Sequence, residues 1–127
     1  MRKVVLFCAV AVTALAVCSA ALGAGGVSGR YTATIKTPAQ IKGKWVLTLA
    51  QGGTYTVSLN GERLARGTYS ATATTITLRE SAAAGCGGVG IYAWRKSGKT
   101  LRFIRKREVQ ACQGRAAVLA HPFTQIR

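Results

Sequence analysis

Residues 43–70 constrain the fold of this chain more than any other stretch. They read GKWVLTLAQGGTYTVSLNGERLARGTYS, and apolar residues alternate with polar ones on both sides of a glycine-rich turn. Side chains of a strand point alternately to its two faces, so Trp45, Leu47 and Leu49 share one face. The Asn60-Gly61 dipeptide tolerates the positive φ that a two-residue hairpin turn requires. The stretch therefore predicts three antiparallel strands with an apolar inner face.

Further segments suited to strands occupy much of the remaining chain. They are residues 30–35, 75–79, 89–96, 100–106, 115–120 and 123–127. No segment after residue 24 has a convincing 3.6-residue period, so strands rather than helices are expected. About eight or nine short strands separated by turns indicate an all-β sandwich or barrel. Consecutive hairpins favour an up-and-down antiparallel barrel of about eight strands, because closure removes exposed sheet edges; an open sandwich is the alternative.

The first 24 residues have the pattern of a secretory signal peptide. Two cations precede an apolar run over residues 4–17, and small residues follow as far as Ala24. The apolar run is shorter than the ~20 residues that span a membrane as a helix. We therefore expect a leader at residues 1–24 and one exported domain at residues 25–127, located outside the cell or in the periplasm.

A second interpretation of the leader concerns residues 15–18. Their sequence, LAVC, resembles the lipobox of bacterial lipoproteins, whose cysteine becomes the lipidated N-terminus. The residue before that cysteine is usually Gly, Ala or Ser, whereas here it is Val17. Lipid anchoring through Cys18 is therefore the alternative to simple export.

The cysteines divide between the leader and the domain. Cys8 and Cys18 belong to the predicted leader, which leaves Cys86 and Cys112 in the exported part. An isolated pair in an exported protein is typical of one disulfide, and a loop of this length gives roughly 3–4 kcal/mol of stabilisation. No His or carboxylate cluster accompanies the pair, so neither a zinc site nor any other metal or cofactor is expected.

The charge of the chain is strongly positive. It contains 18 Lys and Arg residues and three acidic residues, all of them Glu. Without the leader cations Arg2 and Lys3, the domain carries 16 cations and a formal charge of +13. Such a charge predicts attraction to polyanions and a strong dependence of binding on salt.

Seven of these cations concentrate on one expected hairpin and its exit. They are Arg95, Lys96, Lys99, Arg102, Arg105, Lys106 and Arg107. Strand alternation predicts that Arg102 and Lys106 share a face. The set is either a solvated face that keeps the protein soluble or an anion-binding patch. For an exported protein, an anionic polymer of the cell envelope or an anionic membrane surface is a better partner than nucleic acid.

Groups suited to catalysis are sparse. The one histidine, His121, is expected in a surface turn. Glu80 and Glu108 sit in or beside the cysteine-bearing loops, where they either meet each other or pair with the neighbouring Arg79 and Arg107. No set of Ser, His and carboxylate and no phosphate-binding loop is indicated, so the protein is not expected to be an enzyme.

The aromatic residues alternate with polar ones in the expected strands. They either fill the barrel or line a pocket, because about eight strands enclose room for side chains or one small ligand. The leading prediction is a non-catalytic binding module for a small apolar or aromatic ligand, with the pocket formed by Tyr55, Tyr69, Tyr92 and Trp94. The alternative is a filled barrel whose basic hairpin binds envelope polyanions. A cavity of at least ~300 Å³ favours the first function.

Short motifs resemble those of known barrel families. Gly43-Lys44-Trp45 resembles the Gly-x-Trp signature of the calycins, which include lipocalins, fatty-acid-binding proteins and avidins, and Gly67-Thr68-Tyr69 resembles a stretch of avidins. The chain is also similar to small secreted bacterial lipocalin-like proteins in the order of these motifs, Cys86, residues 92–94, Cys112 and residues 115–119. The resemblance implies a calycin-type barrel.

The resemblance also implies a closed barrel end. In calycins the signature Trp closes the bottom of the barrel, and a late Arg packs over its ring, a cation–π contact worth up to about 2 kcal/mol. The corresponding residue here is Trp45, and the candidates for the cation are Arg115 and Arg127. The polar biotin contacts of avidins have no counterpart that can be assigned in this sequence.

Overall fold

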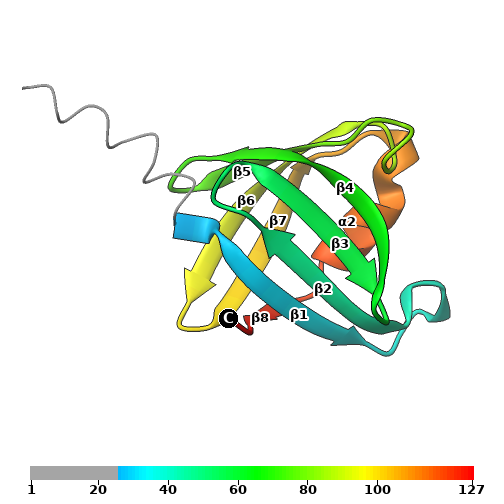
Figure 1. The fold of residues 1–127 in the computed structure, drawn as a ribbon, viewed down its shortest axis with the longest axis horizontal. Coiled ribbons are helices and arrows are strands. Elements are labelled where there is room, and N and C mark those ends of the chain that lie inside the picture. The colour runs from blue at the N-terminus through cyan, green and yellow to red at the C-terminus, as the bar shows by residue number, and fades with distance from the viewer. Residues whose placement is uncertain (1–25) are drawn as a thin grey trace, which may run out of the picture.

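The computed structural model describes residues 26–127, and these form one closed antiparallel barrel (Figure 1). Consecutive strands pair in order, and the last strand pairs with the first. The strands are β1 (Gly29–Ile35), β2 (Gly43–Leu49), β3 (Thr54–Leu59), β4 (Glu62–Ala71), β5 (Thr75–Arg79), β6 (Val89–Ser97), β7 (Thr100–Arg107) and β8 (Phe123–Gln125). The predicted up-and-down barrel is confirmed. The predicted leader lies outside the described residues, as do its two cysteines.

The predicted meander forms β2, β3 and β4. Trp45 is opposite Leu59, and Leu49 is opposite Tyr55, which places the apolar alternation of β2 inside the barrel. Asn60 adopts a φ of 52° and Gly61 a φ of 89° in the turn between β3 and β4. The turn residues and the period of two therefore specify both the pairing and its register.

The predicted strand at residues 115–120 is wrong, because this segment is helical. A short 3₁₀ turn, η3 (Gln110–Cys112), leads into the helix α2 (Gln113–Leu119). The helix buries Ala116, Val118 and Leu119. Residues 115–120 are too few for their period to distinguish a helix from a strand, and alanine favours the helix.

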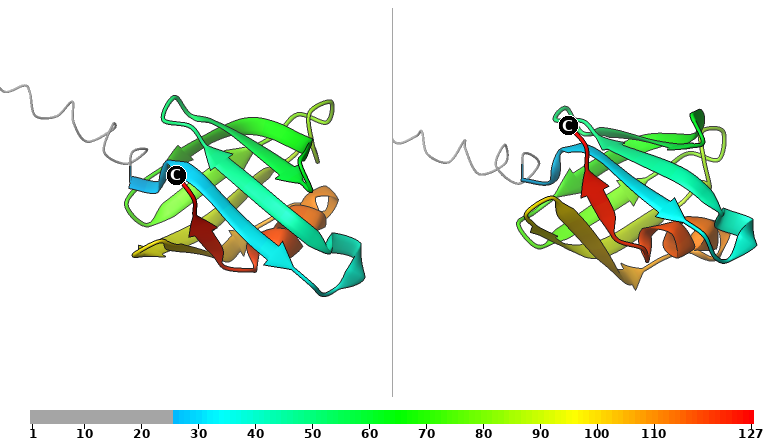
Figure 2. Two further views of the ribbon diagram at one scale, coloured as in Figure 1. Left: turned by 60° about the horizontal axis from the view of Figure 1, so that its bottom comes forward. Right: turned by 90° about the horizontal axis from the view of Figure 1, so that it is seen from below.

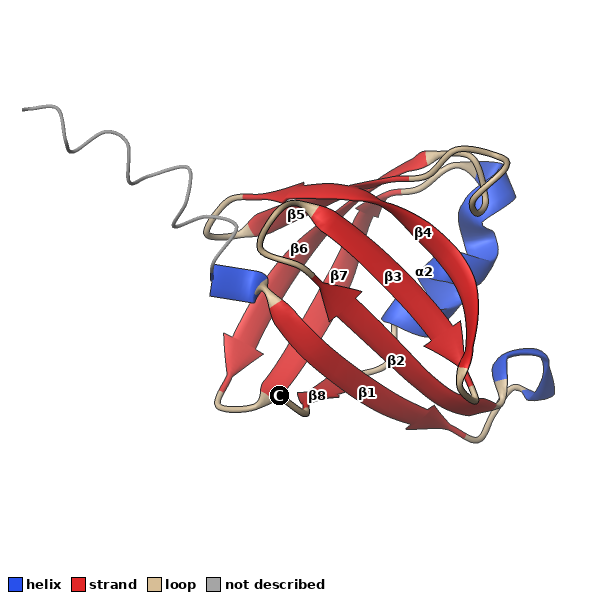
Figure 3. Ribbon diagram, in the orientation of Figure 1, coloured by secondary structure: helices blue, strands red, loops and turns tan. Residues whose placement is uncertain are grey.

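The helix completes the wall where the last strand is short. β8 pairs with β7 at two positions alone, Thr100 with Thr124 and Leu101 with Phe123. α2 packs against β7 and against the 3₁₀ turn η2 (Ala39–Ile41), beyond the end of β8 (Figures 2 and 3). Within residues 26–127, no helix is long and apolar enough to cross a membrane.

The barrel has two different ends. The helix end, on the right in Figure 1, carries η2, the β3–β4 turn, the loop of residues 80–88, η3 and α2. The N-terminal end carries residues 26–28 and the turns before β3, β5 and β7. Val27 is fully buried there, and its carbonyl oxygen accepts a 2.8 Å hydrogen bond from the Tyr31 hydroxyl.

Candidate functional site

Five polar side chains from five different segments meet inside the helix end. Tyr55 comes from β3, Tyr92 from β6 and Arg115 from α2, while Glu80 and Glu108 directly follow β5 and β7. Their charged side chains are almost entirely removed from solvent: Arg115 is 8%, Glu80 3% and Glu108 0% exposed. We call these five residues the buried polar cluster. Charges at this depth are stable only when they are paired and hydrogen-bonded.

Arg115 binds Glu108 through two parallel hydrogen bonds. Its Nε donates to Glu108 Oε2 at 2.9 Å and its Nη2 donates to Glu108 Oε1 at 2.7 Å. The Tyr92 hydroxyl also donates to Oε2, and the backbone N–H of Val109 donates to Oε1 at 3.1 Å. Bidentate pairing is the strongest arrangement of guanidinium and carboxylate, so Glu108 is fully compensated.

Glu80 is held by weaker partners. The Tyr55 hydroxyl donates to its Oε2, and the backbone N–H of Cys86 donates to its Oε1 at 2.8 Å. Arg115 Nη1 lies 3.6 Å from Glu80 Oε2, beyond hydrogen-bond distance, and donates instead to the Tyr55 hydroxyl at 3.3 Å. The single guanidinium therefore neutralises one carboxylate well and the other poorly.

The covalent framework explains why these groups meet. β5 and β7 flank β6, so the residues that follow them emerge side by side at the helix end. The predicted disulfide between Cys86 and Cys112 is confirmed, with a Cα–Cα distance of 5.2 Å. It joins the loop that follows Glu80 to the start of α2, three residues before Arg115.

Two of the glycines that leave room for the cluster lie on strands. A Cβ atom at Gly67 would collide with the backbone of β5 and lie 2.9 Å from the ring of Tyr55. At Gly90 it would lie 2.5 Å from Glu108 Oε2 and 2.8 Å from Arg115 Nη2. Both strands therefore need glycine where the cluster passes their inner face.

The cluster changes the acidity of its members. Burial raises the pKa values of the Tyr55 and Tyr92 hydroxyls, and the carboxylates that accept their hydrogen bonds raise them further. Burial also acts to raise the pKa of Glu108, but hydrogen bonds from Arg115 and Tyr92 outweigh it, so the pKa of this carboxyl is lowered. At neutral pH the tyrosines are therefore protonated donors, and Glu108 is an ionised acceptor.

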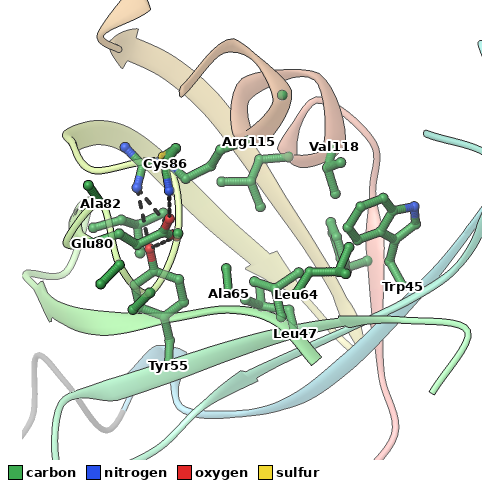
Figure 4. A pocket seen from close by; sticks show the side chains of 18 residues that line it. Trp45, Leu47, Tyr55, Leu64, Ala65, Glu80, Ala82, Cys86, Arg115 and Val118 are labelled. Carbon is green, nitrogen blue, oxygen red and sulfur yellow. Dashed lines mark hydrogen bonds and ion pairs between the residues drawn. The ribbon is translucent and has the colours of Figure 1, made fainter. Parts of the chain in front are cut away.

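A cavity of about 430 Å³ adjoins the cluster. Figure 4 shows Glu80, Tyr55 and Arg115 on one side of it and Trp45 and Val118 on the other. Most of the remaining lining is aliphatic and comes from β2–β5, α2, the loop of residues 82–86 and the start of β8. The cavity is therefore amphipathic, with its polar groups gathered at one side.

The mouth of the cavity is formed where β4 extends past β5. β4 pairs with β5 from Thr68 onward, which leaves its first half without a strand partner on that side. A bulge between Val57 and Ser58 places Leu64 outside the regular register. Leu64 lines the cavity and is 50% exposed, as expected for a residue at an entrance.

The four predicted pocket residues do not form one pocket. Tyr55 lines the cavity, whereas Tyr92 belongs to the polar cluster and does not line the cavity. Tyr69 donates a 2.7 Å hydrogen bond to the carbonyl of Ala50 at the N-terminal end. Trp94 is half-buried outside the cavity, and its indole N–H donates to the backbone of the β4–β5 turn at 2.9 Å.

The predicted closure of the barrel is partly wrong. Trp45 is buried at the helix end, where its indole N–H donates to the Ile41 carbonyl at 2.8 Å. Arg115 does not stack on the indole, because Glu108 holds its guanidinium, and Arg127 is exposed at the end of the chain. Trp45 instead lines the cavity together with Val118 and Leu119 of α2.

Sequence reasoning named the polar residues of the site but did not assign their partners. It placed Glu80 and Glu108 near the cysteines but left open whether they would meet each other or pair with adjacent arginines. It also missed Leu64 and Val118, because a bulge and a short helix gave no periodic signal. The available signal was the position of two of the three acidic residues, each directly after a strand and close to a cysteine.

The basic hairpin forms a second candidate site. Arg95 and Arg102 are directly opposite each other on β6 and β7, and both are exposed. Lys96 points the other way, and its Nζ lies 5.8 Å from the centroid of the Tyr31 ring. The shared face predicted for Arg102 and Lys106 is interrupted, because a bulge leaves Lys106 without a register partner.

A groove of about 740 Å³ runs beside this hairpin. Arg95 and Arg102 line it together with Trp94, Ile104 and His121. Of the 16 Lys and Arg residues in the described range, 14 are exposed, whereas two of the three glutamates are buried in the cluster. Nearly all of the excess positive charge therefore lies on the surface.

Comparisons with models of known protein families, with curated proteins and with solved structures give no match for this chain. The structure itself defines a closed eight-stranded antiparallel β-barrel with one short helix, a disulfide and a buried polar cluster beside an open cavity. Within residues 26–127, no group of His, Cys, Asp or Glu side chains is arranged to hold a metal ion.

Proposed function

We propose that this chain is a non-catalytic binding module that holds a small apolar or aromatic ligand inside its barrel. The observation that supports this function is the cavity of about 430 Å³, which lies within the ~300–1,000 Å³ range of small-molecule sites. Its aliphatic lining and few convergent polar groups are also typical of such sites. The resemblance of the Gly-x-Trp and Gly-Thr-Tyr motifs to calycins supports the same proposal.

The proposed setting is an exported protein. The Cys86–Cys112 disulfide favours an oxidising compartment, since such bonds are rare where thiols are kept reduced. The leader-like composition of residues 1–24 supports the same location. Mass spectrometry of the exported protein tests this setting, because a retained leader or a lipidated Cys18 would each give a distinct mass.

A neutral apolar fluorophore tests the cavity. N-phenyl-1-naphthylamine carries no charge at neutral pH, so the basic surface does not attract it electrostatically. We expect saturable binding with one site per chain and energy transfer from Trp45, measured in a Trp94→Phe background so that Trp45 is the remaining tryptophan. Absence of saturable binding would overturn the proposal.

Two variants of β4 locate the bound probe. Ala65 lines the cavity, so Ala65→Phe is expected to fill it and reduce affinity at least tenfold. Ser70 is exposed on the same strand, so Ser70→Phe adds the same ring outside the barrel and is expected to leave affinity unchanged. Equal losses in both variants would place the probe elsewhere.

The exposed arginine pair favours a second candidate function, binding of an anionic polymer of the cell envelope. Two like charges directly opposite on a sheet repel each other, so Arg95 and Arg102 are favoured when an anion lies between them. The groove beside them offers Trp94 and Ile104 as apolar contacts along an extended chain. This function is compatible with an occupied cavity.

Heparin serves as a probe for this surface. Binding is expected to fall steeply as salt rises, because charges at the surface are screened over about 10 Å at 0.1 M. Replacing Arg95 and Arg102 together with Gln should weaken binding more than replacing the exposed Lys36 and Lys42. Equal effects would mean that net charge alone attracts the polymer, and stronger binding to anionic vesicles than to heparin would indicate a membrane surface instead.

A further inference from the structure

The two carboxylates of the buried polar cluster are not equivalent, and the less compensated one lines the cavity. Glu108 receives both hydrogen bonds of the Arg115 fork, whereas Glu80 lies 3.6 Å from the same guanidinium. Glu80 belongs to the cavity wall. We infer that Glu80 selects a ligand whose head group is a hydrogen-bond donor, above all a protonated amine, and this inference rests on the proposed ligand-binding function.

The charge inside the helix end supports a cationic head. One guanidinium and two carboxylates leave the cluster with a formal charge of −1 when all three are ionised. Both carboxylate side chains are at most 3% exposed, so water compensates this charge poorly. A ligand ammonium beside Glu80 would bring the charge of the cluster to zero.

The hydrogen-bond inventory points to the same oxygen atoms. A carboxylate has about four acceptor positions, and Glu80 uses two of them, for the Tyr55 hydroxyl and the Cys86 backbone N–H. Arg115 has only one donor left, because four of its five N–H groups already have acceptors on Glu108, Gly88 and Tyr55. The site therefore has spare acceptors and almost no spare donors, which favours a donor head over a carboxylate.

The shape of the cavity orients such a ligand. Figure 4 places the polar groups at one side and Trp45 and Val118 at the other. An amphiphile with its amine on Glu80 would extend its apolar chain along Leu47 toward the Trp45 indole. The ligand class inferred here is therefore a primary amine that carries a compact apolar chain or ring.

Three ligands with the same chain and different heads test the inference. We propose to measure how octylamine, 1-octanol and octanoate displace N-phenyl-1-naphthylamine at pH 7 and 0.15 M salt. Octylamine is expected to bind at least tenfold more tightly than octanoate, with octanol between them, since a hydrogen bond to a charged group is worth about one order of magnitude in affinity. The positive surface would by itself give the reverse order, so a preference for the amine must come from inside.

Variants of two glutamates assign the preference to one residue. Glu80→Gln removes the cavity carboxylate and should reduce the ratio of octylamine affinity to octanoate affinity about tenfold. The affinity for octanol should stay within a factor of two to three of the value for the unaltered protein. Glu62→Gln removes the same charge from an exposed position on β4 and should leave the ratio unchanged. Thermal melting of both variants shows whether they remain folded, and the order measured on the unaltered protein stands independently of either variant.

The possible outcomes separate this inference from the proposed function. If octanoate binds as tightly as octylamine, or if Glu80→Gln keeps the preference, the head-group inference is overturned while the cavity function stands. If neither the fluorophore nor any of the three ligands binds, the proposed function fails, and the inference fails with it. An amine preference that disappears in Glu80→Gln and persists in Glu62→Gln would support both.

Discussion

The two ends of the barrel bury the same side chain in opposite ways. Tyr55 and Tyr92 near the helix end and Tyr31 and Tyr69 near the N-terminal end are all between 0% and 5% exposed. The first pair donates to ionisable carboxylates, whereas the second pair donates to backbone carbonyls. Equally buried tyrosines therefore donate to charged acceptors at one end of the barrel and to neutral acceptors at the other.

The difference determines what each end can tolerate. A backbone carbonyl that loses a donor carries no charge and can still accept a hydrogen bond through its second lone pair. The loss of stability is therefore modest. A buried carboxylate that loses a partner retains its charge in a region that excludes water, and the penalty is several times larger. The helix end is therefore the more specific and more fragile half of the barrel, and it is also the half that contains the cavity.

The largest expected effect comes from removing the cation at the helix end. Arg115→Leu should lower the free energy of unfolding by about 3–5 kcal/mol, because it leaves two buried carboxylates without a cation. Urea denaturation monitored by tryptophan fluorescence measures this loss.

The matched variant removes a cation at the other end. Lys96 lies over the ring of Tyr31 and is only partly buried, so Lys96→Leu should cost at most about 1 kcal/mol. Similar losses in the two variants would contradict the idea that the ends differ in how they depend on charge.

A smaller contrast is expected from removing single hydroxyl groups. Tyr92→Phe deletes a donor to Glu108 and should cost about 1.5–3 kcal/mol, whereas Tyr69→Phe deletes a donor to the Ala50 carbonyl and should cost about 0.5–1.5 kcal/mol. Both substitutions keep the ring and its packing, so the comparison isolates the hydrogen bond. The same denaturation experiment measures it, and a larger loss in Tyr69→Phe would reverse the assignment of the two ends.

Local sequence patterns predict the strands and the tight turns of the barrel well. β5 begins at Thr75 and ends at Arg79 as expected, and Asn60 and Gly61 form the expected turn with positive φ. These features depend on neighbours in sequence, since a period of two and a dipeptide turn each lie within a few residues. The strand pairing followed from them without knowledge of the tertiary structure.

The buried polar cluster could not be predicted in the same way, because its contacts join residues distant in sequence. Arg115 contacts a tyrosine 60 residues earlier, and nothing local indicates that pairing. The calycin resemblance made Arg115 and Arg127 candidates for the Trp45 indole, but a carboxylate within reach binds a guanidinium more strongly than an aromatic ring does. The short helix α2 is what directs Arg115 toward Glu108, and its seven residues gave no clear period.

The smallest expected effect is a difference in response to acid. The pKa of Glu108 is lowered in the folded protein, so its contribution to stability is complete above its unfolded pKa of about 4.3 and is lost as the pH falls through the folded value. Within residues 26–127, the Tyr31 and Tyr69 hydroxyls donate to backbone carbonyls and not to acidic side chains. Acid should therefore weaken the helix end, at about 1.4 kcal/mol for each unit by which the two pKa values differ.

The variants Arg115→Leu and Lys96→Leu are expected to differ in whether acid raises or lowers their stability. In Arg115→Leu, burial would act on the Glu108 carboxyl without its cation, so its folded pKa should rise above the unfolded value and acid should stabilise the protein. Lys96→Leu should keep the loss of stability in acid. Urea denaturation between pH 3 and 6 measures both slopes, and the chain suits the experiment because its three glutamates are its only acidic side chains. Slopes of the same sign in both variants would mean that general charge repulsion, rather than Glu108, governs acid stability.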